Sequence, residues 1–199
     1  MFTGIVRGIG HVVACGDDRP RRLSIDTGRL ATSGWRIGDS VSVSGVCLTI
    51  VGLGDRGFDA ELSGETVMRT TLGRLAPGAS VNLEPALAAL DAIGGHFVTG
   101  HVDGIARAIA VAESAGSLSA SIEPPVELAR FIARKGSVAL DGVSLTVGEI
   151  DGAAFRIDIV PHTRSTTTLG RLAAGQELNL EIDLVARYIE RLLDARKGL

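Results

Sequence analysis

Apolar and polar residues alternate in many short stretches of this chain, which is the pattern of half-buried strands. In Leu23–Thr27 and Val41–Ser44 every second side chain is apolar, so one face of each segment would point into a core. Four more stretches are rich in β-prone residues: 2–14, 47–51, 58–62 and 80–84. About six short strands with frequent turn signals predict a small closed barrel with Greek-key connections.

The same order of segments occurs twice. Val41–Ile50 is matched by Val138–Val147, 97 positions later, and Thr70–Ala76 is matched at the same spacing by Thr167–Ala173. A nearly identical spacing carries the start of the chain, Thr3–Ile9, onto residues 99–105. One spacing kept across separate blocks indicates an internal duplication. The sequence therefore predicts an all-β protein with two tandem six-stranded Greek-key barrels, over residues 1–90 and 94–183.

The end of the chain has a different pattern. Apolar residues of Leu184–Leu193 recur at i, i+3 or i+4, and i+7, which predicts an amphipathic C-terminal α-helix within residues 184–199. The first copy has no counterpart, because Pro85 follows its last strand. The helix either packs on its own barrel or contacts another subunit, and the pattern leaves both open. A shorter amphipathic helix is expected over 124–134, and a helical turn within 86–91.

Composition excludes several classes of protein. The 199 residues carry a net charge of −3, and the densest basic cluster, Arg19–Arg22, is interpreted as a solvated turn, so no nucleic-acid partner is expected. No apolar stretch could span a membrane, and the first residues do not resemble a signal peptide. Cys15 and Cys47 form no metal-binding spacing, and His96 and His101 lack a third ligand, so no metal is expected. A reducing cytoplasm fits these two cysteines.

Chemistry is expected where the two copies differ. The differing pairs each place a titratable or nucleophilic group at a strand end or turn: Ile5/His101, Gly38/Lys135, Ser44/Asp141, Cys47/Ser144 and Glu65/His162. Two interpretations stay open at this point, drift of surface residues after duplication and a division of chemical roles between like pockets. Cys47 alone could be a buried small hydrophobe. The chain contains no Gly-x-Ser-x-Gly elbow and no phosphate-binding loop.

Several motifs together resemble the riboflavin synthase family, the alpha chain that dismutates lumazine. They are Met1–Val6, Gly45–Thr49, Glu65–Thr66 with Thr70–Gly73, Gly94–Gly104, Lys135–Gly136, Asp141–Val147 and Val160–Thr163. The resemblance covers nearly the whole chain and departs from the family at Gly64, Met68 and Pro85. It implies a cofactor-free transferase in which two molecules of 6,7-dimethyl-8-ribityllumazine exchange a four-carbon unit. The products are riboflavin and 5-amino-6-ribitylamino-pyrimidinedione, and the reaction is the last step of riboflavin biosynthesis.

The resemblance implies one substrate-binding set in each copy. The set expected at the first barrel is Gly4, Ile5, Val6, Ser40, Cys47, Leu48, Thr49, Glu61, Leu62, Ser63, Gly64, Glu65 and Thr66. The set expected at the second barrel is Gly100, His101, Val102, Lys135, Ser144, Leu145, Thr146, Asp158, Ile159, Val160, Pro161, His162 and Thr163.

The expected catalytic residues are Ser40, Cys47, His101, Lys135, Asp141 and Ser144. The chemistry needs a base for the methyl group on C7 of one ring and a nucleophile that activates C7 of the other. Our hypothesis gives proton transfer to His101 and addition at C7 to Ser40 or Cys47. Lys135 and Asp141 would orient groups or balance charge.

The resemblance also implies partners. It predicts a homotrimer gathered by the C-terminal helix, with each site between the first barrel of one subunit and the second barrel of its neighbour, and an association with lumazine synthase. The alternative function is a non-catalytic lumazine- or flavin-binding protein on the same fold. A binder would be expected to lose the polar residues of the second copy, which are present here. An FAD-binding barrel of a reductase is discounted, because 199 residues leave no room for a nucleotide domain.

Overall fold

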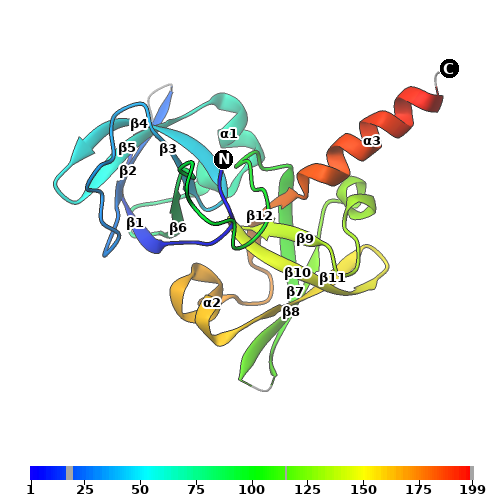
Figure 1. Ribbon diagram of the computed structural model, residues 1–199. Helices are drawn as coiled ribbons and strands as arrows, with labels where there is room; N and C mark the ends of the chain where they lie inside the picture. The colour runs from blue at the N-terminus through cyan, green and yellow to red at the C-terminus, as the bar shows by residue number, and fades with distance from the viewer. Residues whose placement is uncertain (17–19, 115, 198–199) are drawn as a thin grey trace.

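The structure is a computed structural model that describes residues 1–16, 20–114 and 116–197, and it contains two closed barrels followed by a helix (Figure 1). The strands of the first barrel are β1 (Gly8–Cys15), β2 (Arg21–Asp26), β3 (Ser40–Val43), β4 (Val46–Gly54), β5 (Gly57–Leu62) and β6 (Ser80–Pro85). Those of the second are β7 (Gly104–Ser114), β8 (Ser117–Glu123), β9 (Ser137–Leu140), β10 (Val143–Asp151), β11 (Ala154–Ile159) and β12 (Glu177–Ile182). Part of the turn expected before β2, including Arg19, lies outside the described residues.

Both barrels have the same connectivity. The first closes in the order β1-β2-β5-β4-β3-β6, and the second follows this order with its own six strands. All the strand pairs are antiparallel, and β-bulges interrupt the register at equivalent places, such as Ile50/Gly52 in β4 and Val147/Ile150 in β10. The prediction of two duplicated six-stranded barrels is confirmed.

Helices are few and short apart from the last. They are α1 (Gly64–Arg69), α2 (Pro161–Thr166), α3 (Leu184–Lys197) and 3-10 turns over Thr71–Arg74, Val126–Phe131 and Thr168–Arg171. The C-terminal helix is therefore confirmed, whereas the helix expected over 124–134 is only a 3-10 turn. α1 was not predicted; Ser63 caps this helix by accepting a hydrogen bond from the Thr66 N–H. No helix in the described part of the chain is long and apolar enough to cross a membrane.

Each barrel has its own apolar core, and a small third cluster joins the two. Leu23, Ile50 and Leu83 are among the fully buried side chains of the first barrel, and Ile157 has the same role in the second. The third cluster consists of Phe2, Val98 and Ala139, with Cys47 packed against it. Phe2 and Val98 exchange backbone hydrogen bonds of 2.7 and 3.1 Å. The start of the chain is thus fixed beside the segment that links the barrels.

Residues expected to begin the first strand instead leave their own barrel. Thr3–Val6, here the first strap, runs to the second barrel, where the Ser144 N–H donates to the Gly4 carbonyl at 2.8 Å and Val6 packs on the core. Thr99–Val102, the second strap, runs to the first barrel, where the Cys47 N–H donates to the Gly100 carbonyl at 2.9 Å. Each copy therefore lends a strap to the other, and β1 begins only at Gly8.

A buried glutamate holds each strap at its root. Glu84 of β6 accepts hydrogen bonds from Thr3 N, Thr3 Oγ1 and Gly4 N at 2.7, 2.7 and 3.0 Å. Glu181 of β12 accepts the equivalent three from Thr99 and Gly100 at 2.7, 2.6 and 2.9 Å. Burial raises the pKa of Glu84, although the three donors oppose that shift. This explains why Asn-Leu-Glu occurs at the same place in both copies.

Two asparagines cross between the barrels in the same reciprocal way. The Asn82 amide donates to the Asp141 carbonyl at 2.9 Å and accepts from the Thr168 N–H at 2.8 Å. Asn179 donates to the Ser44 carbonyl at 2.8 Å and accepts from the Thr71 N–H at 2.8 Å. Because each amide side chain satisfies backbone groups of the other barrel, these bonds fix how the two barrels sit together.

Candidate functional site

The outer face of β4 carries the predicted residues of the first barrel. Leu48 and Ile50 point into the core and are buried, so the alternate residues Cys47 and Thr49 point outward. Ser40 of β3 pairs with Thr49. Leu62, the last residue of β5, lies beside the start of β4, since Ile50 pairs with Ala60. The outward groups of β3, β4 and the β5–α1 corner thus share one surface.

The second strap completes this surface. The bond from Cys47 N to the Gly100 carbonyl places His101 and Val102 next to Cys47, and Val102 packs on the first-barrel core. Glu61 and the start of α1, residues 63–66, form the far side. We call the set Ser40, Cys47, Thr49, residues 61–66 and His101–Val102 the first surface.

The second barrel carries an equivalent surface with different polar groups. Ser144 and Thr146 point outward from β10, and the first strap brings Gly4–Val6 against Ser144. Lys135 precedes β9, and residues 158–163 run from the end of β11 into α2. We call this set the second surface.

The assignment of two segments to barrels was wrong. The family resemblance implied that Gly4, Ile5 and Val6 lie with the first barrel and Gly100, His101 and Val102 with the second. In the structure the two segments lie on the opposite barrels, because each strap crosses to the other barrel. His101 therefore shares a surface with Cys47 and Ser40, while Ser144 and Lys135 lie with Ile5.

One residue that the predicted catalytic set omitted lies against Ser144. His96 Nδ1 is 2.7 Å from Ser144 Oγ, and burial lowers the pKa of this histidine, against the opposing charges of Asp183 and Glu181. A neutral imidazole hydrogen-bonded to a serine hydroxyl can serve as its base, so His96 and Ser144 are a candidate base–nucleophile pair. A Cβ on Gly95 would lie 2.2 Å from the Thr3 carbonyl oxygen, which explains the glycine before His96. The motif Gly94–Gly–His was visible in the sequence, but its contact with Ser144 was not.

Lys135 has a backbone conformation that is rare for its residue type. Its φ is +67°, in the left-handed region, where the equivalent residue of the first copy is Gly38 with φ +97°. The Lys135 N–H donates to the Val147 carbonyl at 2.9 Å, which fixes the turn. A side chain kept at a position suited to glycine supports a functional role for this exposed ammonium group.

Asp141 lies in the contact between the barrels. With φ values of +44° and +76°, Asp141 and Gly142 form the two-residue hairpin turn that Asp-Gly favours. Asp141 Oδ1 accepts the Asn179 N–H at 2.8 Å, and the side chain is buried. Its equivalent, Ser44, accepts the Asn82 N–H at 3.2 Å. The Asp141 side chain thus holds this turn on β12 of its own barrel, while the Asp141 carbonyl accepts from Asn82 of the other barrel.

Replacing Asp141 by asparagine is expected to remove one source of pH-dependent stability. Burial raises the pKa of Asp141 from 3.8 to about 7. The folded state therefore binds more protons than the unfolded state between these values, and the free energy of unfolding falls as pH rises from about 4 to 7. Asp141→Asn keeps the acceptor oxygen without the charge, so its Tm at pH 8 should exceed that of the wild type, by on the order of 5 °C.

Thermal unfolding of Asp141→Asn from pH 4 to pH 8 measures this effect. Asp55→Asn, at an exposed turn, serves as the control and should follow the wild type. A difference in Tm between Asp141→Asn and wild type that does not grow with pH would contradict the raised pKa of Asp141.

Placing a side chain at Gly100 is expected to displace the second strap. Its φ is +80°, and a Cβ there would lie 2.5 Å from the Cys47 Cβ. Gly100→Ala should cost about 1–3 kcal/mol of stability and lower turnover, because His101 moves with the strap. Gly34→Ala is the matched control, since it has φ +94° and open space around the added Cβ. Equal effects of the two variants in denaturant unfolding would show that contact with Cys47 does not matter.

Comparison with known proteins agrees with this duplicated architecture. A family model described as the lumazine binding domain matches twice, over residues 3–86 and 99–183. A riboflavin synthase from Photobacterium phosphoreum is 41% identical over 196 residues, covering 97% of this chain and 89% of the relative. One from Mycobacterium bovis is 42% identical over 203 residues, covering 97% and 98%. The chain belongs to the riboflavin synthase family.

Solved structures similar to this family member include binding proteins. A structure of LumP complexed with riboflavin superposes with a TM-score of 0.84 at 27% identity, covering 92% of this chain and 99% of that one. A second, of LumP complexed with 6,7-dimethyl-8-(1'-D-ribityl) lumazine, gives a TM-score of 0.82. Identity to these LumP chains is lower than to the riboflavin synthases, so the sequence comparison favours the enzymes.

Proposed function

We propose that this riboflavin synthase family member transfers a four-carbon unit between two molecules of 6,7-dimethyl-8-ribityllumazine, one bound at each kind of surface. The observation that carries the proposal is identity of 41–42% to riboflavin synthases over 97% of the chain. The duplicated fold gives it a physical reason. Two identical substrates need two similar surfaces, and two different roles need different polar groups on them.

The polar groups suit the two halves of the reaction. On the first surface, Cys47 and Ser40 are nucleophile candidates for addition at C7, and His101 is a candidate for proton transfer. On the second surface, the hydroxyl of Ser144 is hydrogen-bonded to His96. Holding two rings face to face would supply much of the acceleration through proximity. The chemistry needs no redox cofactor, since one ring gains the carbons that the other loses.

Both surfaces are too exposed to exclude water from a bound ring by themselves. Thr49 and His101 on the first and Lys135, Thr146 and His162 on the second are exposed. A reaction between two bound rings requires that water be excluded, so we infer that the first surface of one subunit faces the second surface of its neighbour.

The C-terminal helix suits the role of assembling subunits. Figure 1 shows α3 projecting away from both barrels. Val185, Tyr188, Ile189, Leu192 and Leu193 are each more than half exposed along it. In its first half, Arg187 pairs with Asp103 at 2.9 Å, and Arg130 pairs with Glu190. A helix anchored at one end with an uncovered apolar face supports a homotrimer held by α3, which sedimentation of the full chain and of Leu192→Glu tests.

Two further proposals come from the family resemblance. The trimer would associate with lumazine synthase, which co-sedimentation of the two purified proteins tests. A cytoplasmic location would suit Cys15 and Cys47, which are free thiols.

Incubation of the purified chain with 6,7-dimethyl-8-ribityllumazine alone tests the activity. Absorbance should show one riboflavin formed for every two lumazine molecules consumed. The similarity to LumP favours a second candidate, a lumazine-binding protein. Tight binding of lumazine without conversion would support that alternative and contradict the proposed reaction.

A further inference from the structure

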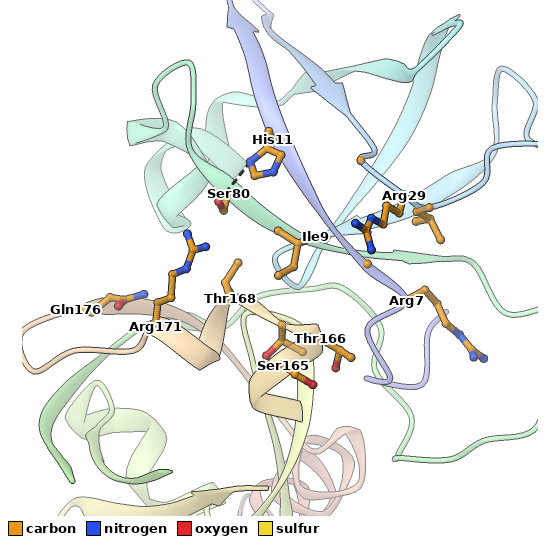
Figure 2. Close-up of a pocket in the computed structure, with 14 residues that line it drawn as sticks. Arg7, Ile9, His11, Arg29, Ser80, Ser165, Thr166, Thr168, Arg171 and Gln176 are labelled. Carbon is orange, nitrogen blue, oxygen red and sulfur yellow. Dashed lines mark hydrogen bonds between the residues drawn. The ribbon is translucent and has the colours of Figure 1, made fainter. Parts of the chain in front are cut away.

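A cleft between the barrels adjoins the second surface, because both include residues of α2. Its volume is about 830 Å³, and it is lined from the first barrel by β1, the turn after β2 and Ser80, and from the second by α2 and the 3-10 turn that follows. None of the predicted substrate-binding residues lines it. Figure 2 shows Arg171 rising from the second barrel toward Ser80 and His11 of the first. An occupant would therefore contact both barrels at once.

The lining of this cleft is cationic although the whole chain is acidic. Arg29 and Arg171 line it with His11, Arg7 lies at its edge, and none of the aspartates and glutamates that the structure describes lines it. Among the described residues, neither Arg29 nor Arg171 forms an ion pair. In a chain of net charge −3, arginines facing one cleft without carboxylates leave an uncompensated positive potential there.

The duplicated fold has a second position equivalent to this cleft, and there the arginine charges are neutralised by a glutamate. Ser80 corresponds to Glu177, which pairs with Arg74 at 2.7 Å and lies 3.8 Å from Arg107. Arg74 and Arg107 are the counterparts of Arg171 and His11, as the matched registers of β1 with β6 and of β7 with β12 show. Arg7 corresponds to Asp103, which pairs with Arg187 of α3. The arginines of this second place are paired with Glu177, whereas Arg29 and Arg171 of the cleft form no ion pair with described residues.

Hydroxyl groups lie among these cations. Ser80, Ser165, Thr166 and Thr168 line the cleft. The hydroxyls of Ser165 and Thr166 already donate to the His162 carbonyl, so the arginines are the main donors that face the cleft. Guanidinium groups form charge-assisted, often bidentate hydrogen bonds with tetrahedral oxyanions.

We propose that this inter-barrel cleft is a binding site for a phosphate monoester, with Arg29 and Arg171 as its main ligands. The volume exceeds what inorganic phosphate alone would fill, so the organic part of the ester would occupy the remainder. The lumazine substrate carries no phosphate, so the site is separate from the proposed reaction. Because its ligands come from both barrels, occupancy would stabilise the pair against thermal unfolding.

Calorimetric titration of the full chain with ribose 5-phosphate, in chloride buffer of constant ionic strength, tests the site. Ribose 5-phosphate should bind measurably and raise Tm, inorganic phosphate should bind more weakly, and ribose should not bind. Arg29→Gln and Arg171→Gln should each weaken binding by about tenfold or more, since each removes a charged hydrogen-bond donor. Arg156→Gln, at an exposed arginine of the second barrel that pairs with Asp158, is the matched control and should bind as the wild type does.

Turnover of lumazine separates this proposal from the proposed function. Both cleft variants should keep wild-type turnover, since neither arginine lies on the two surfaces. Equal binding of ribose 5-phosphate by Arg29→Gln/Arg171→Gln and wild type would overturn the site, as would no binding by the wild type. Inorganic phosphate binding as tightly as the ester would overturn the assignment to an ester.

Discussion

Replacing His101 by glutamine is expected to lower kcat by about 100-fold or more, with a much smaller change in KM. A positioned acid–base group contributes about 10²–10⁴-fold, and glutamine keeps the size and hydrogen-bonding capacity of histidine without its titration. The side chain follows Gly100, whose carbonyl is fixed by the Cys47 N–H, so the substitution should leave the strap in place. Steady-state kinetics on lumazine alone, from pH 5 to pH 9, measure both constants.

The matched control for His101 is His162 on the second surface. His162→Gln removes another exposed imidazole, one that follows the first residue of α2, and should lower kcat far less. If His101→Gln turns over lumazine at the wild-type rate with an unchanged pH profile, proton transfer does not pass through His101. The alternative base would then be His96, through Ser144.

Replacing Phe2 by alanine is expected to destabilise the chain by about 3–5 kcal/mol, the usual cost of deleting a buried phenyl ring. Phe2 is fully buried in the cluster between the barrels, and its backbone pairs with Val98. Since Thr3 and Gly4 follow directly, the loss should also loosen the first strap at Ser144 and lower turnover. Urea unfolding and the lumazine assay measure the two effects.

Phe97→Ala provides the comparison for Phe2. Phe97 is adjacent to Val98 in the chain, yet 49% of it is exposed, so its truncation should cost well under half as much. Similar losses in the two variants would mean that the cluster at Phe2 does not hold the barrels together.

The barrels could be predicted from the sequence because their signals are local. Alternation in Val41–Ser44 predicts a strand and its buried face. The repeat 97 positions later predicts that the second copy has the same order of strands. The exchange of straps could not be predicted. Thr3–Val6 and Thr99–Val102 carry nearly the same residues, and either barrel offers the same backbone partner, Cys47 or Ser144. A repeat shows that two surfaces are alike but not which copy supplies each strap.

Contacts between side chains could not be predicted from the sequence as strands could, for a related reason. Asp141 differs from Ser44, and that difference was interpreted as chemistry. In the structure both side chains accept a backbone N–H within their own barrel, and both carbonyls accept an asparagine amide from the other barrel. The contact between His96 and Ser144 joins positions 48 residues apart, which only the tertiary structure shows. Glu84 and Glu181 were visible as repeated residues, but their buried hydrogen bonds to the straps depend on the fold.

Complementation between two inactive variants tests the central claim, that unlike surfaces of neighbouring subunits form one reaction site. One chain would carry His101→Gln on the first surface, and the other Ser144→Ala on the second. The two would be co-expressed with different tags and purified through both. Mixed assemblies should regain lumazine turnover well above either parent, because the intact first surface of one subunit meets the intact second surface of the other. Mixed assemblies that form but stay as inactive as both parents would contradict the claim.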